Sequence, residues 1–166
     1  WLYGLGELCK RTFESTPGVG QVKGFSTIKS GQNVALDTVI IIYFLERHPQ
    51  FYQSVKNLFV RIEQGDIKAN MSSLVFAELL VPAYRSDNSK DAEKIIRLLN
   101  LFPNLIISPM TITIAQKSAK LQADYNLRTP DAIHVATALH NKSDFFITND
   151  KSLQKISPHL KVLVCE

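Results

Sequence analysis

The stretch "LRTPDAIHVATALH", residues 127–140, places an acidic side chain at the start of a predicted helix. Thr129 is a good N-cap residue, Pro130 suits the first helical position, and Ile133 with its alanine neighbours supplies an apolar face. Asp131 therefore stands where the helix dipole stabilises a negative charge, and this alone would explain it. The same position would also suit a carboxylate that binds a metal ion. Which interpretation holds depends on what the rest of the chain brings near Asp131.

The composition indicates one folded domain with a sizeable core. The chain has 166 residues, of which 45% are hydrophobic and 20% charged, so it resembles neither a disordered nor a membrane protein. Its longest apolar run, residues 39–45, is too short to cross a bilayer. Cys9 and Cys165 form no metal-binding or disulfide pattern. These features predict a soluble cytoplasmic protein, and the net charge of +4 mildly favours polyanionic partners.

Glycine usage divides the chain near residue 31. Six of the seven glycines lie before residue 32, in a segment without sustained strand or helix periodicity. We interpret residues 1–31 as an extension of unknown role and residues 32–166 as one domain. Because the chain begins at Trp1, we expect a truncated or processed product.

Apolar bursts alternate with helical patterns from residue 32 onward. Five segments read as strands: 33–37, 66–72, 104–109, 144–150 and 161–166. Helices are expected over 38–48, 49–65, 74–85, 111–126, 129–140 and 151–157, and segment 86–102 reads as a polar loop followed by an amphipathic helix. The isoleucine-rich segment 38–48 is ambiguous by propensity, and Pro82 should kink or stop its helix. The alternation predicts a parallel α/β sheet with helices on both faces.

Four acids fall where such a sheet would bring them together. Asp37 and Asp150 follow the first and fourth predicted strands, and ligands bind at the carboxyl ends of parallel strands. Glu78 lies in an apolar helix after the second strand, and Asp131 starts a helix. Crowded carboxylates repel one another unless a cation or a proton neutralises them. Convergence of the four would therefore indicate a cation site.

The chemistry that uses such a cluster is metal-assisted phosphodiester cleavage. Mg²⁺ and Mn²⁺ prefer carboxylate oxygens, and they polarise a phosphate and activate a bound water. Thr148 could orient Asp150 or that water, or be an ordinary residue at a strand end. Val39 stands where a haloacid-dehalogenase-type phosphatase would carry a second aspartate, which argues against that class.

Each acid also has a purely structural explanation. Asp37 could cap the following helix, Asp150 could belong to a turn, and Glu78 could point to solvent. His134 lies three residues after Asp131 on the same helical face, and we favour a packed or hydrogen-bonded histidine over a metal ligand.

Four segments resemble the motifs of PIN-domain nucleases in their order and approximate spacing. The likeness is closest to VapC-like toxins of bacterial and archaeal toxin–antitoxin pairs, and it covers roughly residues 33–166. The segments are "VALDTVIIIYFL" (34–45), "SSLVFAELL" (72–80), "LRTPDAIHVATAL" (127–139) and "FFITNDKSL" (145–153). This resemblance implies a three-layer α/β/α fold around a central, mainly parallel sheet of about five strands.

The resemblance also implies an activity and a set of site residues. The family's acids match Asp37, Glu78, Asp131 and Asp150, as metal-binding and catalytic residues, and Thr148 matches the hydroxyl residue beside the last acid. The implied protein is a Mg²⁺- or Mn²⁺-dependent endoribonuclease that forms a homodimer and is inhibited by a small cognate antitoxin. Two alternatives stay open: an RNA-processing or DNA-acting PIN nuclease, and a catalytically silent PIN-fold binding module.

Basic and aromatic side chains near these acids are candidates for RNA contacts. Arg128 and Lys151 flank Asp131 and Asp150, and Arg85 follows the helix of Glu78, so all three could bind phosphates. The basic residues between 89 and 100 fit a solvated helix face better. The aromatic rings at positions 43 and 84 could stack on bases, or pack in the core or a dimer.

Overall fold

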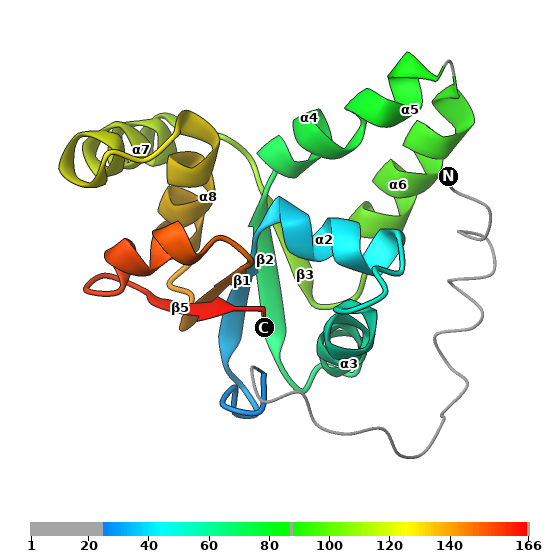
Figure 1. Ribbon diagram of the computed structural model, residues 1–166, viewed down its shortest axis with the longest axis horizontal. Helices are drawn as coiled ribbons and strands as arrows, with labels where there is room; N and C mark the ends of the chain where they lie inside the picture. Colours follow the sequence, from blue (N-terminus) through cyan, green and yellow to red (C-terminus); the bar gives the residue numbers. More distant parts are fainter. Residues whose placement is uncertain (1–24, 87, 166) are drawn as a thin grey trace.

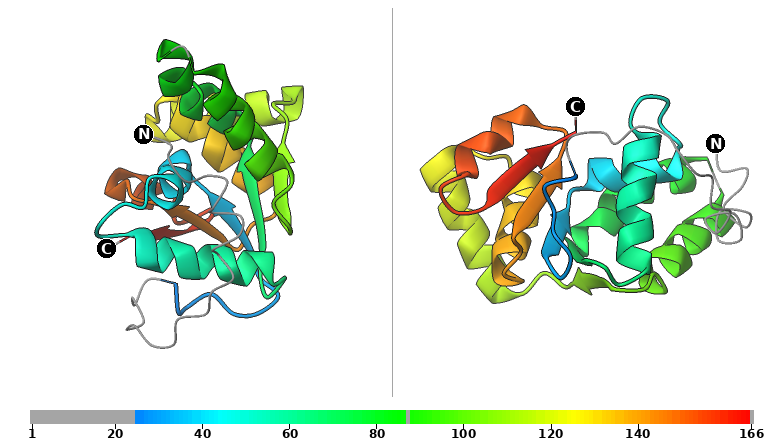
Figure 2. Two further views of the ribbon diagram at one scale, coloured as in Figure 1. Left: turned by 90° about the vertical axis from the view of Figure 1, so that its right-hand side faces the viewer. Right: turned by 90° about the horizontal axis from the view of Figure 1, so that it is seen from below.

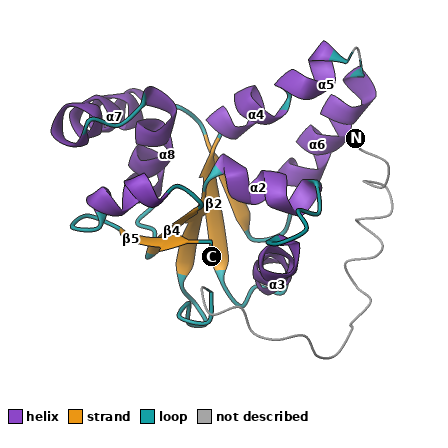
Figure 3. Ribbon diagram, viewed as in Figure 1, coloured by secondary structure: helices purple, strands orange, loops and turns teal. Residues whose placement is uncertain are grey.

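The computed structural model describes residues 25–86 and 88–165, which form a sheet flanked by helices (Figures 1 and 3). The strands are β1 (Asn33–Leu36), β2 (Lys68–Ser72), β3 (Leu105–Ser108), β4 (Phe145–Thr148) and β5 (Lys161–Val164). The helices are α2 (Thr38–Leu45), α3 (Tyr52–Glu63), α4 (Leu74–Leu79), α5 (Val81–Arg85), α6 (Ser89–Asn100), α7 (Ile112–Tyr125), α8 (Thr129–His140) and the 3₁₀ helix η1 (Lys151–Ile156).

All five strands run parallel, in the order β3-β2-β1-β4-β5. β1 is central: Val34 pairs with Ala69 of β2 on one side and with Phe145 of β4 on the other. The predicted parallel α/β sheet is confirmed. In this order the carboxyl ends of β1 and β4 are neighbours, which fixes where Asp37 and Asp150 lie.

Alternate side chains of the strands pack on opposite faces of the sheet. Val34 and Leu36 belong to the larger hydrophobic core, which includes apolar residues of α2, α3 and α6. Ala35 and Phe146 belong to the second core, with α7 and α8. The alternation follows from the period of two along a strand. Helices therefore cover both faces, and two views at right angles show the three layers (Figure 2).

Local sequence signals explain several element ends, and one predicted helix cap is wrong. Segment 38–48 forms α2 up to Leu45, because Asp37 caps it and its apolar side chains are buried on the sheet. Pro82 lies in the first turn of α5, where the chain breaks between α4 and α5. The prediction that Thr129 caps α8 is wrong: Arg128 stands at the N-cap, and the Thr129 hydroxyl donates to Gln122 Oε1 instead, at 2.8 Å.

Most of the predicted extension, including Cys9, lies outside the described residues. Within its described part, the side chains of Phe25 and Ile28 are buried against the larger core. The Arg61 guanidinium donates to the backbone carbonyls of both residues. Among the described helices, none has both the length and the apolar character that crossing a membrane requires.

A buried amide network ties the C-terminal end of α8 to the sheet. Asn70, in β2, is 1% exposed on the face that carries α8. Its Nδ2 donates to Asn33 Oδ1 at 2.9 Å and to Ser143 Oγ at 2.8 Å. Its Oδ1 accepts from Asn141 Nδ2, which also donates to Ser108 Oγ. These bonds fix the position of α8, and hence of Asp131 at its other end.

Candidate functional site

Asp37 lies between the end of β1 and the start of α2 and uses its two oxygens differently. Oδ1 accepts from the Thr38 backbone N–H at 2.7 Å and so caps α2. Oδ2 accepts from the Thr148 hydroxyl at 2.5 Å. The structural and the functional interpretations of Asp37 are therefore compatible, because helix capping leaves the second oxygen directed at the end of β4.

Asp150 shows the same division of roles beside β4. Its Oδ1 accepts from the Ser152 backbone N–H and caps η1, whereas Oδ2 lies 4.0 Å from Arg128 Nη2. Thr148 is fully buried; its Oγ accepts from the Asp150 backbone N–H while it donates to Asp37. One threonine thus fixes the geometry of both acids.

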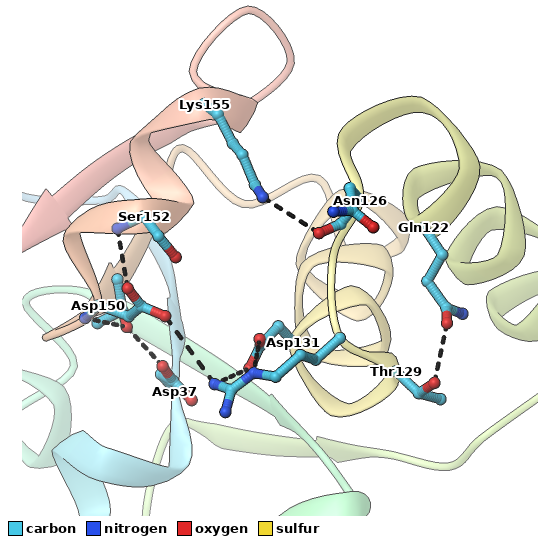
Figure 4. Close-up of polar contacts among 10 residues, drawn as sticks. Asp37, Gln122, Asn126, Thr129, Asp131, Asp150, Ser152 and Lys155 are labelled. Atoms are coloured by element: carbon cyan, nitrogen blue, oxygen red, sulfur yellow. Dashed lines mark hydrogen bonds and ion pairs between the residues drawn. The ribbon is translucent and has the colours of Figure 1, made fainter.

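Asp131 faces these two acids from the first turn of α8. Figure 4 shows Asp37 and Asp150 on the strand side of the site and Asp131 across from them on α8. The Arg128 guanidinium donates to both oxygens of Asp131, from Nε at 2.9 Å and from Nη2 at 3.3 Å. The pKa of Arg128 is raised, first by these hydrogen bonds to Asp131 and further by the charges of Asp150 and Asp37. The guanidinium therefore lies in the field of three carboxylates.

Glu78 joins the site through a separate set of contacts. Its Oε2 accepts from the Thr38 hydroxyl and lies 3.0 Å from His134 Nε2. The pKa of Glu78 is lowered, chiefly because His134 hydrogen-bonds to it. His134 is buried and hydrogen-bonded, as its position on α8 favoured.

Asp37 differs from Glu78 in the direction of its pKa shift. Burial raises the pKa of Asp37, and the hydrogen bond from Thr148 offsets only part of that effect. A carboxylate whose charge is poorly solvated in the fold destabilises the folded chain unless a cation compensates it.

This shift predicts how stability changes with pH in the absence of divalent ions. Because the pKa of Asp37 is higher folded than unfolded, the folded chain holds the proton over the interval between the two values. The contribution of Asp37 to the free energy of unfolding therefore falls as the pH rises through that interval. In EDTA, urea unfolding should show wild type losing stability relative to Asp37→Asn as the pH rises. If wild type instead gained stability relative to Asp37→Asn as the pH rises, this would contradict a raised pKa of Asp37.

The remaining candidates are two basic and two aromatic side chains. Lys151 is exposed and directly follows Asp150, whereas Arg85 is exposed at the end of α5. No hydrogen bond or ion pair within the described residues links Arg85 to the acids. Tyr43 stacks on Phe51 and its hydroxyl accepts from Asn149, so it is engaged in packing. Tyr84 is 58% exposed.

The four acids suit a hard divalent cation chemically, because their metal-binding atoms would all be carboxylate oxygens. Two of them, Asp131 and Asp150, already face the Arg128 guanidinium. Across residues 25–86 and 88–165, no three or more His, Cys, Asp or Glu side chains are grouped closely enough to hold a metal ion. The Arg128 guanidinium binds Asp131 through two hydrogen bonds and lies 4.0 Å from Asp150 Oδ2. The chemistry of these donors, rather than their spacing, therefore fits a hard divalent cation.

The family model for the PIN domain matches residues 34–157, which include all four acids and Thr148. The chain belongs to the PIN domain family. PIN domains are generally nucleases that hydrolyse nucleic acids with the help of divalent metal ions. No curated protein sequence matches this PIN domain.

Several solved structures share the fold at low sequence identity. The VapBC2 complex of Rickettsia felis, bound to a DNA fragment from its promoter, is 19% identical, with a TM-score of 0.63 over 81% of this chain and 100% of that one. VapBC-1 of nontypeable Haemophilus influenzae is 24% identical, with a TM-score of 0.60 over 80% and 98%. A toxin–antitoxin complex of Klebsiella pneumoniae is 22% identical, with a TM-score of 0.59 over 80% and 98%.

The sequence did not reveal two contributions to this PIN domain's site. Thr38 carries no motif of its own, and only its position after Asp37 could have suggested it. The contact between Arg128 and Asp131 was also missed, although their spacing of three residues on a helix start is a recognisable ion-pair signal.

Proposed function

We propose that this PIN domain is a divalent-metal-dependent endoribonuclease and the toxin of a toxin–antitoxin pair. The observation that supports this most is that Asp37, Asp131 and Asp150, from three separate elements, surround the Arg128 guanidinium and raise its pKa. We assign Glu78 as the fourth acid and Thr148 as the residue that orients Asp37 and Asp150. A silent binding module would gain nothing from the buried Asp37 carboxylate, whose raised pKa means that its charge destabilises the fold.

The proposed reaction is hydrolysis of an RNA phosphodiester by water. When bound, Mg²⁺ or Mn²⁺ would polarise the phosphate and lower the pKa of a water molecule. Asp37, Asp131 and Asp150 would hold the ion, with Glu78 beside them. Arg128 and Lys151 border the acids and would bind the phosphates of the RNA, and Arg85 would contact the chain farther along.

Arg128 has two roles in this proposal, because it must leave Asp131 before a cation binds there. Arg128→Gln should bind Mn²⁺ about two- to fivefold more tightly, as expected from loss of one exposed ion pair, while KM for RNA rises. Calorimetric Mn²⁺ titration checks the affinity, and cleavage kinetics check KM. Lys155→Gln is the matched control, since Lys155 donates to the Asn126 carbonyl and should leave Mn²⁺ affinity unchanged (Figure 4). Weaker Mn²⁺ binding by Arg128→Gln would contradict the proposal that Arg128 and the cation compete for Asp131.

The substrate class is tested by cleavage of mixed single-stranded RNA and of DNA of the same sequences. Each is incubated with purified protein in Mg²⁺, in Mn²⁺ or in EDTA. The proposal predicts cutting of RNA that needs the metal. Cutting confined to DNA would favour the DNA-acting alternative, and undiminished cutting in EDTA would exclude the four-acid mechanism.

The proposed partners are a small protein antitoxin and a second copy of the chain. The structural neighbours are toxin–antitoxin complexes, which supports an antitoxin. Expression without antitoxin should arrest growth, and Asp131→Asn should relieve the arrest. Metal-dependent RNA cleavage in vitro without growth arrest would favour an RNA-processing nuclease over a toxin.

A further inference from the structure

Three polar side chains from three helices contact one another beside Asp37. His134 of α8 is 4% exposed, and its Nε2 lies 3.0 Å from Glu78 Oε2 of α4 and 3.2 Å from Thr38 Oγ of α2. The Thr38 hydroxyl also donates to Glu78 Oε2. One carboxylate oxygen of Glu78 is thus held from two sides.

The surroundings of His134 fix its tautomer. A carboxylate only accepts hydrogen bonds, so Nε2 must carry the hydrogen that points to Glu78. Nδ1 is buried and has no hydrogen-bond partner within the described residues. Burying an unpaired polar atom costs stability. An apolar side chain of similar size would remove that cost, so packing alone does not account for a histidine here.

This contact connects Glu78 to both sides of the site. Thr38 directly follows Asp37, whose Oδ1 accepts from the Thr38 backbone N–H. His134 lies one helical turn after Asp131 on α8. Glu78 is itself on a short helix, and 34% of its side chain is exposed, so its own helix leaves it room to move. The two hydrogen bonds set its carboxylate relative to Asp37 and Asp131.

We propose that His134 is a positioning residue that, together with Thr38, holds the Glu78 carboxylate in the place where it completes the acid cluster. This rests on the proposed nuclease function. His134 acts through Glu78 and does not itself touch the RNA or the ion. The positioning role depends on the hydrogen bond that Nε2 donates to Glu78. Another side chain that donates an N–H from the same place should therefore replace His134 in part.

The test compares His134→Leu with His134→Gln. His134→Leu removes the donor, keeps the volume and abolishes the unpaired nitrogen, which offsets the loss of the hydrogen bond to Glu78, so Tm should change little. Its kcat for RNA should drop about 10- to 100-fold, the range seen when a partner that orients a metal ligand is removed, with KM changed less than about twofold. His134→Gln restores an N–H donor and should recover most of kcat. Thr137→Val is the matched control, because Thr137 is buried on the same helix and its hydroxyl donates to the Ile133 carbonyl rather than to Glu78.

A double-mutant cycle isolates the route through Glu78. If His134 acts only through Glu78, the double variant His134→Leu/Glu78→Gln should be no slower than Glu78→Gln alone. Mn²⁺ affinity, measured by calorimetry, should fall alike in the two single variants, which gives a readout independent of cleavage. Three results would each overturn the proposal. The first is a kcat and a Mn²⁺ affinity of His134→Leu that equal those of wild type. The second is a kcat that His134→Gln does not recover, and the third is additive losses of kcat in the double variant.

Failure of the proposed nuclease function would give different results from failure of the positioning role of His134. Wild type that cuts equally well in EDTA would refute metal-dependent hydrolysis, whatever His134 does. If wild type binds Mn²⁺ without cutting RNA, the affinities of His134→Leu and Glu78→Gln still decide the positioning role. Wild type that binds no Mn²⁺ would overturn both proposals.

Discussion

Asp37→Asn is expected to lower the rate of metal-supported RNA cleavage by about two to three orders of magnitude without lowering Tm. The substitution removes one negative charge from the three acids around Arg128, and an amide is a poor ligand for a hard divalent ion. The amide can still accept from the Thr38 N–H, so α2 keeps its cap. Because burial raises the pKa of Asp37, loss of its charge relieves a cost of folding in metal-free protein.

The matched control for Asp37→Asn is Asp124→Asn. Asp124 lies on α7, is about half exposed, and pairs with Lys120 at 3.8 Å, away from the site. Its cleavage rate should stay within about twofold of wild type, as expected for a surface change. Initial rates on one RNA, together with thermal unfolding in EDTA, provide both comparisons. An Asp37→Asn variant that retains more than about a tenth of the wild-type rate would contradict its assignment as a metal ligand.

Asn70→Ala should lower the free energy of unfolding by about 2–4 kcal/mol, a large loss for the truncation of one polar side chain. The truncation leaves Asn33 Oδ1, Ser143 Oγ and Asn141 Nδ2 without the partner that Asn70 gives them. These groups are at least partly buried between the sheet and α8, where water replaces a lost partner poorly. The free energy of unfolding is measured by urea titration.

Asn57→Ala provides the control for Asn70→Ala. Asn57 is exposed on α3, where its side chain only accepts from Gln53, and its loss should change the free energy of unfolding by less than about 0.5 kcal/mol. An Asn70→Ala variant within about 1 kcal/mol of wild type would mean that the network is not needed to hold α8. Since α8 carries Asp131, the same variant should also weaken Mn²⁺ binding in the fraction that remains folded.

The sheet and the positions of Asp37 and Asp150 were predictable because they depend on chain order. Strands that alternate with helices give a parallel sheet, and acids that follow parallel strands lie at one edge of it. This reasoning placed Asp37 and Asp150 beside each other. The start of α8 was predicted to within one residue, although the capping residue was not.

The contacts that tune the site were not predictable, because they join residues far apart in the sequence. His134 meets Glu78 and Thr38 across 56 and 96 positions, and no periodicity encodes such a meeting. Asn70 looks like an unfavourable residue within a strand until its partners from β1 and the end of α8 are known.

The measurement that tests the central claim most directly is the chemistry of the cleaved RNA ends. Wild type is incubated with RNA and Mn²⁺, with an EDTA sample beside it, and the ends are identified by mass spectrometry. Attack by water at the carboxylate site predicts a linear phosphate monoester on one product, a hydroxyl on the other, and no cleavage in EDTA. A 2′,3′-cyclic phosphate formed equally well in EDTA would show that the ribose hydroxyl is the nucleophile and would contradict the account.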